Sequence, residues 1–124
     1  MLIKTKSIYE GPEESDGRRV YVERLWPRGL TRDEARVDDW LREIAPNEGM
    51  LAWFSGKPER WDEFEEDFFD DLNGRAEQIS QLFDIAMEGP VTLLYDYDDP
   101  KHNSAVAVRD YLEKMLPDYK KAAA

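Results

Sequence analysis

The sequence contains no cysteine among its 124 residues and a single histidine, His102. The absence of cysteine excludes disulfides, thiol catalysis and metal sites built from thiolates. It also fits a reducing compartment, so we expect the protein to be cytoplasmic. No run approaches the roughly 18 consecutive apolar residues of a membrane-spanning helix, and we therefore expect no membrane partner.

Positive charge is also scarce. Lysine and arginine supply 17 positive charges against 28 negative charges from aspartate and glutamate, which gives a formal net charge of −11. A protein of this charge repels the phosphate backbone, so general nucleic-acid binding is disfavoured. The sequence also lacks the short motifs of nucleotide, dinucleotide, zinc-protease and serine-hydrolase sites, so it points to no particular cofactor or reaction.

Length and composition predict one folded domain. A chain of 124 residues, of which 41% are hydrophobic, can bury a single core but not two. We expect this domain to cover residues 1–117. Pro117 is expected to end the last helix, which leaves residues 118–124 as a loose tail.

Three stretches are typical of β-strands. Residues 2–9 alternate apolar and polar side chains, residues 19–26 hold β-branched and aromatic residues, and residues 91–95 form a short apolar run. The last run is typical of a strand that is covered on both faces. We therefore predict an α/β fold with a small, mainly parallel, three-stranded sheet covered by helices. The alternative is a two-layer α+β arrangement, because residues 10–18 are short for a parallel crossover.

Capping residues and amphipathic spacing predict the helices. Thr31 and Glu34 form a capping box, and Asn47 is a second helix cap. The expected helices start at Thr31, at Asp38 or Asp39 (ending at Pro46), at Asn47 (ending at Ser55), at Pro58 (ending at Asn73), near Ala76 and at Ser104.

Two basic side chains lie where the second strand is expected to end. Arg24 and Arg28 flank Pro27, which cannot donate a hydrogen bond to a sheet. A charge at the end of a buried strand is costly unless it has a partner, so both arginines are candidate ligand-binding residues. Trp26 is a candidate pocket wall beside them. Asp16, in the turn before the strand, is a further candidate.

The loop after the third expected strand carries His102, and the last helix begins at Asn103 and Ser104. The N-terminus of a helix has free N–H groups and attracts anions. If the last two strands are parallel, this loop meets Arg24 and Arg28 at the sheet edge where α/β proteins bind ligands. We therefore predict a pocket for a small anion (phosphate, nucleotide or carboxylate), with His102 as the acid or base if the chain is an enzyme.

Each of these residues also has a structural interpretation. Arg24 could pair with a nearby carboxylate, which would be that of Glu23, Asp96 or Asp98. Arg28 could cap the strand or lie on the surface, and Asp16 could serve only its turn. His102 could be an ordinary residue at a helix start. The aspartates of residues 96–99 lack the glycine spacing of a calcium loop, so we predict no metal site. A non-catalytic protein that senses a ligand or binds a protein partner is the alternative to an enzyme.

Several motifs of the chain match one known family. The most specific is the run Arg24-Leu25-Trp26-Pro27-Arg28-Gly29, and it is joined by Ser15-Asp16-Gly17, Arg19-Val20, Asp39-Trp40, Ala45-Pro46, Trp53-Phe54, Pro58-Glu59-Arg60-Trp61, Leu93-Leu94-Tyr95 and His102-Asn103. Over about residues 3–116 the sequence resembles the YeaO-like family, small bacterial and archaeal proteins grouped under domain of unknown function 488.

The resemblance implies a parallel α/β sheet with a shortened first crossover, and it carries over no cofactor and no catalytic residues. It also points to one departure. Many family members carry a His-Asp pair immediately before the Pro-x-Arg-Trp motif, and this chain has Gly56-Lys57 at that place. If that histidine serves a shared activity, this chain lacks it or relies on His102.

Overall fold

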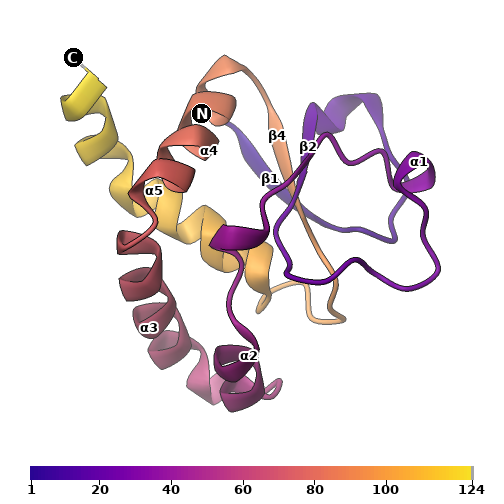
Figure 1. Cartoon of the computed structure of the whole chain (residues 1–124), viewed down its shortest axis with the longest axis horizontal. Coiled ribbons are helices and arrows are strands. Elements are labelled where there is room, and N and C mark those ends of the chain that lie inside the picture. Colours follow the sequence, from indigo (N-terminus) through magenta and orange to yellow (C-terminus); the bar gives the residue numbers. More distant parts are fainter. Residues whose placement is uncertain (124) are drawn as a thin grey trace.

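The computed structural model describes residues 1–123 and contains a four-stranded sheet in which all neighbouring strands are parallel (Figure 1). The strands are β1 (Ile3–Ser7), β2 (Arg18–Tyr21), β3 (Asp39–Trp40) and β4 (Val91–Tyr95), in the order β1-β4-β2-β3. The α/β class and the parallel sheet are thus confirmed. The sheet has four strands where three were predicted.

Strand β4 forms the centre of this sheet. All five of its residues are buried, as its apolar composition predicted. It pairs with β1, where Ile3 lies opposite Val91, and with β2, where Val20 lies opposite Leu93. Because β1 and β2 lie on either side of β4, they never pair with each other.

The connection from β1 to β2 is short because it crosses the face of β4 without an α-helix. It contains one turn of 3₁₀-helix (Glu14–Asp16) and ends at Gly17, whose φ is +63°. A Cβ atom on Gly17 would lie 2.2 Å from the carbonyl oxygen of Pro90. Only glycine allows the backbone to approach β4 so closely at this turn.

The helices are α1 (Arg32–Ala35), α2 (Glu48–Phe54), α3 (Trp61–Asn73), α4 (Ala76–Glu88) and α5 (Ser104–Ala123). Further 3₁₀ turns cover Arg42–Ile44 and Pro58–Arg60. Both predicted caps are present: Thr31 and Glu34 form the capping box of α1, and Asn47 accepts a hydrogen bond from the Met50 N–H at the start of α2. Figure 1 shows α3, α4 and α5 on one side of the sheet and α1 on the other.

The two faces of the sheet bury different cores. The larger core lies between the sheet and the helices, where Val20 and Leu93 meet Phe68 and Leu112. The smaller core lies on the other face and consists mainly of aromatic and aliphatic side chains from the sheet and from the segment that follows β2. Its members are Ile8, Tyr21, Ala35 and Leu94, with Trp26, Leu30, Val37 and Trp40 packed against them.

Residues 38–46 are not the helix that their spacing predicted. The N–H of Asp38 donates to the Arg19 carbonyl at 2.8 Å, and the N–H of Leu41 donates to the Tyr21 carbonyl at 3.0 Å. The segment therefore extends along β2 as strand β3. These hydrogen bonds join residues far apart in the sequence, so local spacing could not reveal them.

Helix α5 continues past Pro117 to Ala123, so the expected end of the helix at Pro117 is wrong. Proline removes one backbone hydrogen bond, to the carbonyl of Glu113 on the exposed side of the helix. Beyond it, the ring of Tyr119 stacks on Phe83 of α4, with centroids 4.4 Å apart. This packing extends the helix through residues that were expected to form a tail; residue 124 lies outside the described part of the chain.

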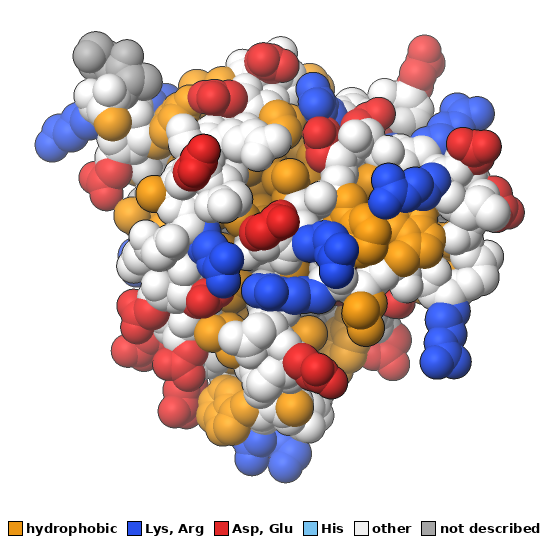
Figure 2. Space-filling model, viewed as in Figure 1, with side chains coloured by type: hydrophobic (Ala, Val, Ile, Leu, Met, Phe, Trp, Pro, Cys, Tyr) orange, Lys and Arg blue, Asp and Glu red, His pale blue; other side chains and the backbone are white. Residues whose placement is uncertain are grey.

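Basic side chains gather across the middle of the molecular face in Figure 2, and acidic side chains lie mostly around them. The guanidinium group of Arg32 lies 5.4 Å from the ring centroids of both Trp26 and Trp40, and that of Arg42 lies 4.9 Å from Trp40. These cations stack on the partly exposed rings of the smaller core. Within residues 1–123, no helix is both long enough and apolar enough to cross a bilayer.

Candidate functional site

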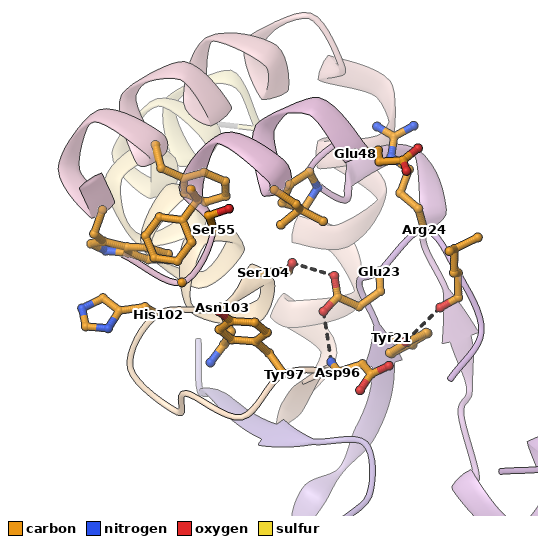
Figure 3. A pocket seen from close by; sticks show the side chains of 17 residues that line it. Tyr21, Glu23, Arg24, Glu48, Ser55, Asp96, Tyr97, His102, Asn103 and Ser104 are labelled. Atoms are coloured by element: carbon orange, nitrogen blue, oxygen red, sulfur yellow. Dashed lines mark hydrogen bonds between the residues drawn. The ribbon is translucent and has the colours of Figure 1, made fainter. Parts of the chain in front are cut away.

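A pocket of about 470 Å³ opens at the carboxyl edge of the sheet (Figure 3). Its walls come from the segment after β2, from α2, from the start of α3, and from the loop that joins β4 to α5. The lining residues are Tyr21, Glu23, Arg24, Leu25, Pro46, Glu48, Leu51, Phe54, Ser55, Gly56, Trp61, Phe64, Asp96, Tyr97, His102, Asn103 and Ser104. The pocket thus lies at the edge where the parallel strands end.

Aromatic side chains form one wall of the pocket. The rings of Phe54, Trp61 and Phe64 lie with centroids 5.2–5.5 Å apart, so α2 and α3 present a continuous apolar surface. Leu51 extends this surface toward solvent and is 40% exposed. Such a wall suits the apolar body of a small organic molecule.

The carboxyl group of Glu23 is the polar centre of the pocket. Its Oε1 accepts a hydrogen bond from the Ser104 hydroxyl at 2.6 Å, and its Oε2 accepts one from the Asp96 N–H at 3.0 Å. Figure 3 shows these bonds joining the ends of β2 and β4 to the start of α5. Burial raises the pKa of Glu23 to about 7; the two hydrogen bonds oppose this rise, and the nearby Asp96 charge adds to it.

The start of α5 brings the three predicted residues of this loop into the pocket. Asn103 is buried and caps the helix, since its Oδ1 accepts from the Val106 N–H at 3.0 Å. His102 lies at the pocket edge, where its ring meets the edge of Trp61 at 5.2 Å between centroids. Its Nδ1 lies 2.8 Å from Asp99 Oδ2, and this hydrogen bond lowers the pKa of Asp99.

Arg24 also lines the pocket, but its guanidinium group is engaged by the backbone. Its Nε and Nη2 donate to the Ala45 carbonyl at 3.1 and 2.9 Å. In Figure 3, Arg24 and Glu48 lie at the opposite end of the pocket from His102. The side chains of Arg24 and His102 therefore do not converge on one point.

The remaining candidates from the sequence lie outside the pocket lining. Arg28 is exposed, and its backbone carbonyl accepts a hydrogen bond from the Tyr9 hydroxyl at 2.9 Å. Trp26 belongs to the smaller core on the other face of the sheet, where its Nε1 donates to the Leu30 carbonyl. The chain bends at Arg24-Leu25 and turns at Arg28-Gly29, and Arg28 does not line the pocket.

Asp16 lies at the amino end of β2, across the sheet from the pocket. Its carboxylate is buried and accepts hydrogen bonds from Arg19 at 2.6 Å and from Lys6 at 3.2 Å. Burial alone would raise the pKa of Asp16, but the bonds from the Glu13 N–H, Arg19 and Lys6 together lower it. Arg19 also donates to the Ala35 carbonyl, so this ion cluster links the β1–β2 connection to α1.

The sequence analysis missed the aromatic wall of the pocket and also Glu23, which it considered only as an ion-pair partner for Arg24. One signal was present in the sequence: an acidic residue directly follows the apolar run Val20-Tyr21-Val22. Its partner Ser104 lies 81 residues further along the chain. Only the fold brings the two together.

A family model named DUF488-N3i, described as the inactive DUF488-N3 subclade, matches residues 2–124 of the chain. The chain belongs to the DUF488 family. Two uncharacterized proteins illustrate the similarity. YeaO of Escherichia coli K12 is 34% identical over 115 residues, which cover 93% of this chain and 100% of YeaO. Rv3073c of Mycobacterium tuberculosis H37Rv is 33% identical over 92 residues, which cover 73% of this chain and 78% of Rv3073c. No solved structure matches this DUF488 chain.

Gly56, the residue at which the resemblance implies a histidine, lies in the pocket of this DUF488 chain. Its φ is +66°, and a Cβ there would lie 2.5 Å from the Tyr97 hydroxyl oxygen. Tyr97 can therefore approach the backbone at a position where a side chain would block it. Among residues 1–123, no group of three or more histidine, aspartate or glutamate side chains is arranged to hold a metal ion.

Proposed function

We propose that this chain is a non-catalytic binding protein for a small, partly apolar molecule that occupies the pocket at the carboxyl edge of the sheet. The observation that carries this proposal is a pocket that combines an aromatic wall with the half-buried carboxyl group of Glu23. Its volume of about 470 Å³ lies in the range of small-molecule sites. The parallel topology supports the same location, because α/β proteins bind ligands where their strands end.

Two features support binding without catalysis. The matching family model is described as an inactive subclade, and Gly56 stands in the pocket where the resemblance places a histidine. His102 is not bonded to the Ser104 hydroxyl, which donates to Glu23 instead.

The predicted anionic ligand is not the one that the pocket favours. An anion would be expected at the N-terminus of α5, where helix N–H groups are free. There the protein's own Glu23 carboxylate bonds Ser104, and Asn103 caps the helix. Glu23 would repel a second anion at this place, so the proposed ligand is neither a phosphate nor a carboxylate.

Binding to the pocket can be tested with a neutral aromatic probe, tryptophol. We expect tryptophol to shift the ¹H–¹⁵N NMR signals of Ser55, Gly56 and Ser104 in the full chain. Leu51→Ala removes part of the apolar wall and should weaken binding several-fold. Met87→Ala, on α4 away from the pocket, is the matched control, because Met87 is similarly exposed at 47%. Absence of binding, or equal effects of the two substitutions, would contradict the proposal.

One observation favours a second candidate, an acyl-transfer enzyme. The Ser104 hydroxyl lies 2.6 Å from a carboxyl group whose pKa burial raises to about 7, which is the arrangement of a nucleophile and a general base. The reagent p-nitrophenyl acetate separates the candidates. A binding protein releases nitrophenol at the same rate before and after Ser104→Ala, whereas a burst that Ser104→Ala abolishes would establish the enzyme.

A further inference from the structure

We propose that the molecule bound in this pocket carries a protonated amine or a similar cationic N–H group, which pairs with the Glu23 carboxylate. This inference rests on the proposed function and names the chemical class of its ligand. It replaces the small anion of the sequence prediction with a small organic cation.

The hydrogen bonds of Glu23 leave room for such a group. A carboxylate offers about four acceptor positions, and protein donors fill two of them, from Ser104 and Asp96. Both donors are neutral. Within residues 1–123, no lysine or arginine forms an ion pair with Glu23. Its neighbour Arg24 is held by the Ala45 carbonyl instead.

The charges around Glu23 favour a cation over an anion. Glu48 and Asp96 line the pocket together with Glu23, and Arg24 and His102 are the basic residues among its lining. Removing a carboxylate from water without an opposite charge is costly, and a buried cation beside it offsets that cost. This cost is the reason that burial raises the pKa of Glu23 to about 7 in the ligand-free protein.

The aromatic wall favours the same ligand class. The faces of tryptophan and phenylalanine rings attract cations, and the rings of Trp61 and Phe64 lie in the pocket with Glu23. A flat or aromatic body would contact the wall formed by Phe54, Trp61 and Phe64. Its charged group would then face the carboxylate, at the place where the ends of β2 and β4 meet the start of α5.

Three probes with the same indole ring test the charge preference: tryptamine, which is cationic, tryptophol, which is neutral, and indole-3-propionate, which is anionic. At about pH 8 the amine is still protonated and Glu23 is mostly ionised. We expect NMR titrations of the full chain to give tryptamine an affinity about tenfold or more above tryptophol, because a hydrogen bond to a charged group is the stronger kind. Indole-3-propionate should bind most weakly.

Glu23→Gln keeps the shape of the side chain and should abolish the preference for tryptamine. Glu63→Gln, an exposed residue of α3 that does not line the pocket, should retain it. Equal affinities of tryptamine and tryptophol for the wild-type pocket would overturn the cation inference and leave the proposed function standing. Failure of both probes to bind would contradict the two proposals together. The comparison of tryptamine with tryptophol in the wild-type protein tests the cation inference even if Glu23→Gln does not fold.

Discussion

A carboxyl group that leaves a buried strand and enters an apolar pocket loses much of its hydration. For Glu23 this burial raises the pKa from the ordinary value of 4.5 to about 7. Between these two values the folded protein holds a proton that the unfolded chain has released. The protonated group therefore stabilises the fold fully below pH 4.5, and this contribution is lost as the pH rises through 7.

Replacing Glu23 with glutamine should remove this pH dependence. We expect the free energy of unfolding of the wild type to fall relative to that of Glu23→Gln between about pH 4 and pH 8, by about 3 kcal/mol at most. Urea unfolding of both proteins across this range measures the difference. If the free energies of unfolding of the two proteins change with pH in parallel, the fold does not raise the pKa of Glu23.

At the other end of β2, the buried ion cluster around Asp16 should contribute to the stability of the fold. Asp16→Asn leaves the buried guanidinium of Arg19 without its carboxylate, and we expect a loss of about 3 kcal/mol in urea unfolding at neutral pH. Arg28→Ala is the control, since that side chain is exposed, and it should change stability by less than about 0.5 kcal/mol. Comparable losses of unfolding free energy for Asp16→Asn and Arg28→Ala would contradict a structural role that Asp16 has and Arg28 lacks.

These residues show where sequence reasoning about a site reaches its limit. Residue type and position placed Arg24, His102, Asn103 and Ser104 at the right edge of the sheet. They could not show that Arg24 lines the pocket and Arg28 does not, because this difference depends on the path of the chain between the two residues. The direction of a side chain depends on this path, and the path depends on contacts distant in sequence.

At the scale of elements, the turn between α2 and the following 3₁₀ turn approaches the β4–α5 loop at Gly56. The Tyr97 ring reaches Gly56, where the backbone has a positive φ and no side chain intervenes. This contact closes one side of the pocket. Because Tyr97 lies so close to the Gly56 backbone, we expect a substitution of Gly56 to lower the stability of the fold.

Gly56→Ala should destabilise the fold for two separable reasons. The positive φ strains any residue with a Cβ, at a cost of about 1 kcal/mol, and the new atom also meets the Tyr97 hydroxyl. In the background of Tyr97→Phe the second cost should disappear while the first remains. Urea unfolding of the single and double variants measures the coupling. Additive effects would indicate that Tyr97 does not lie against Gly56.

The elements that the sequence predicted well are those with strong local signals. The apolar run of β4 and the caps of α1 and α2 depend on neighbouring residues, and all three were found as predicted. Strand β3 and the end of α5 depend on distant partners. Asp38 and Leu41 bond the backbone of β2, and Tyr119 stacks on Phe83, so local patterns around Asp39 and Pro117 were misleading.

At the scale of the whole molecule, the net charge of −11 acts against compactness. Repulsion among acidic side chains is relieved by salt, whose screening length falls from about 10 Å at 0.1 M to about 3 Å at 1 M. We expect the melting temperature to rise by several degrees as sodium chloride increases over this range. A melting temperature that is unchanged or falls would mean that attractive surface pairs outweigh the repulsion.

The fold places the pocket where three parts of the molecule meet: the strand ends, the helical side of the sheet, and the segment that follows β2. Glu23, in the segment that follows β2, accepts hydrogen bonds from Ser104 at the start of α5 and from Asp96 at the end of β4. A ligand that pairs with Glu23 would therefore contact the residue that joins these parts of the fold.

The most direct test of this account is an NMR titration of the Glu23 carboxyl carbon in the full chain, with and without saturating tryptamine. In the free protein we predict a midpoint near pH 7, as burial raises the pKa of Glu23 to about 7. A bound cation should move that midpoint down, because it stabilises the ionised carboxylate. A midpoint near the ordinary value of 4.5 in the free protein, or one that tryptamine leaves unchanged, would contradict the account.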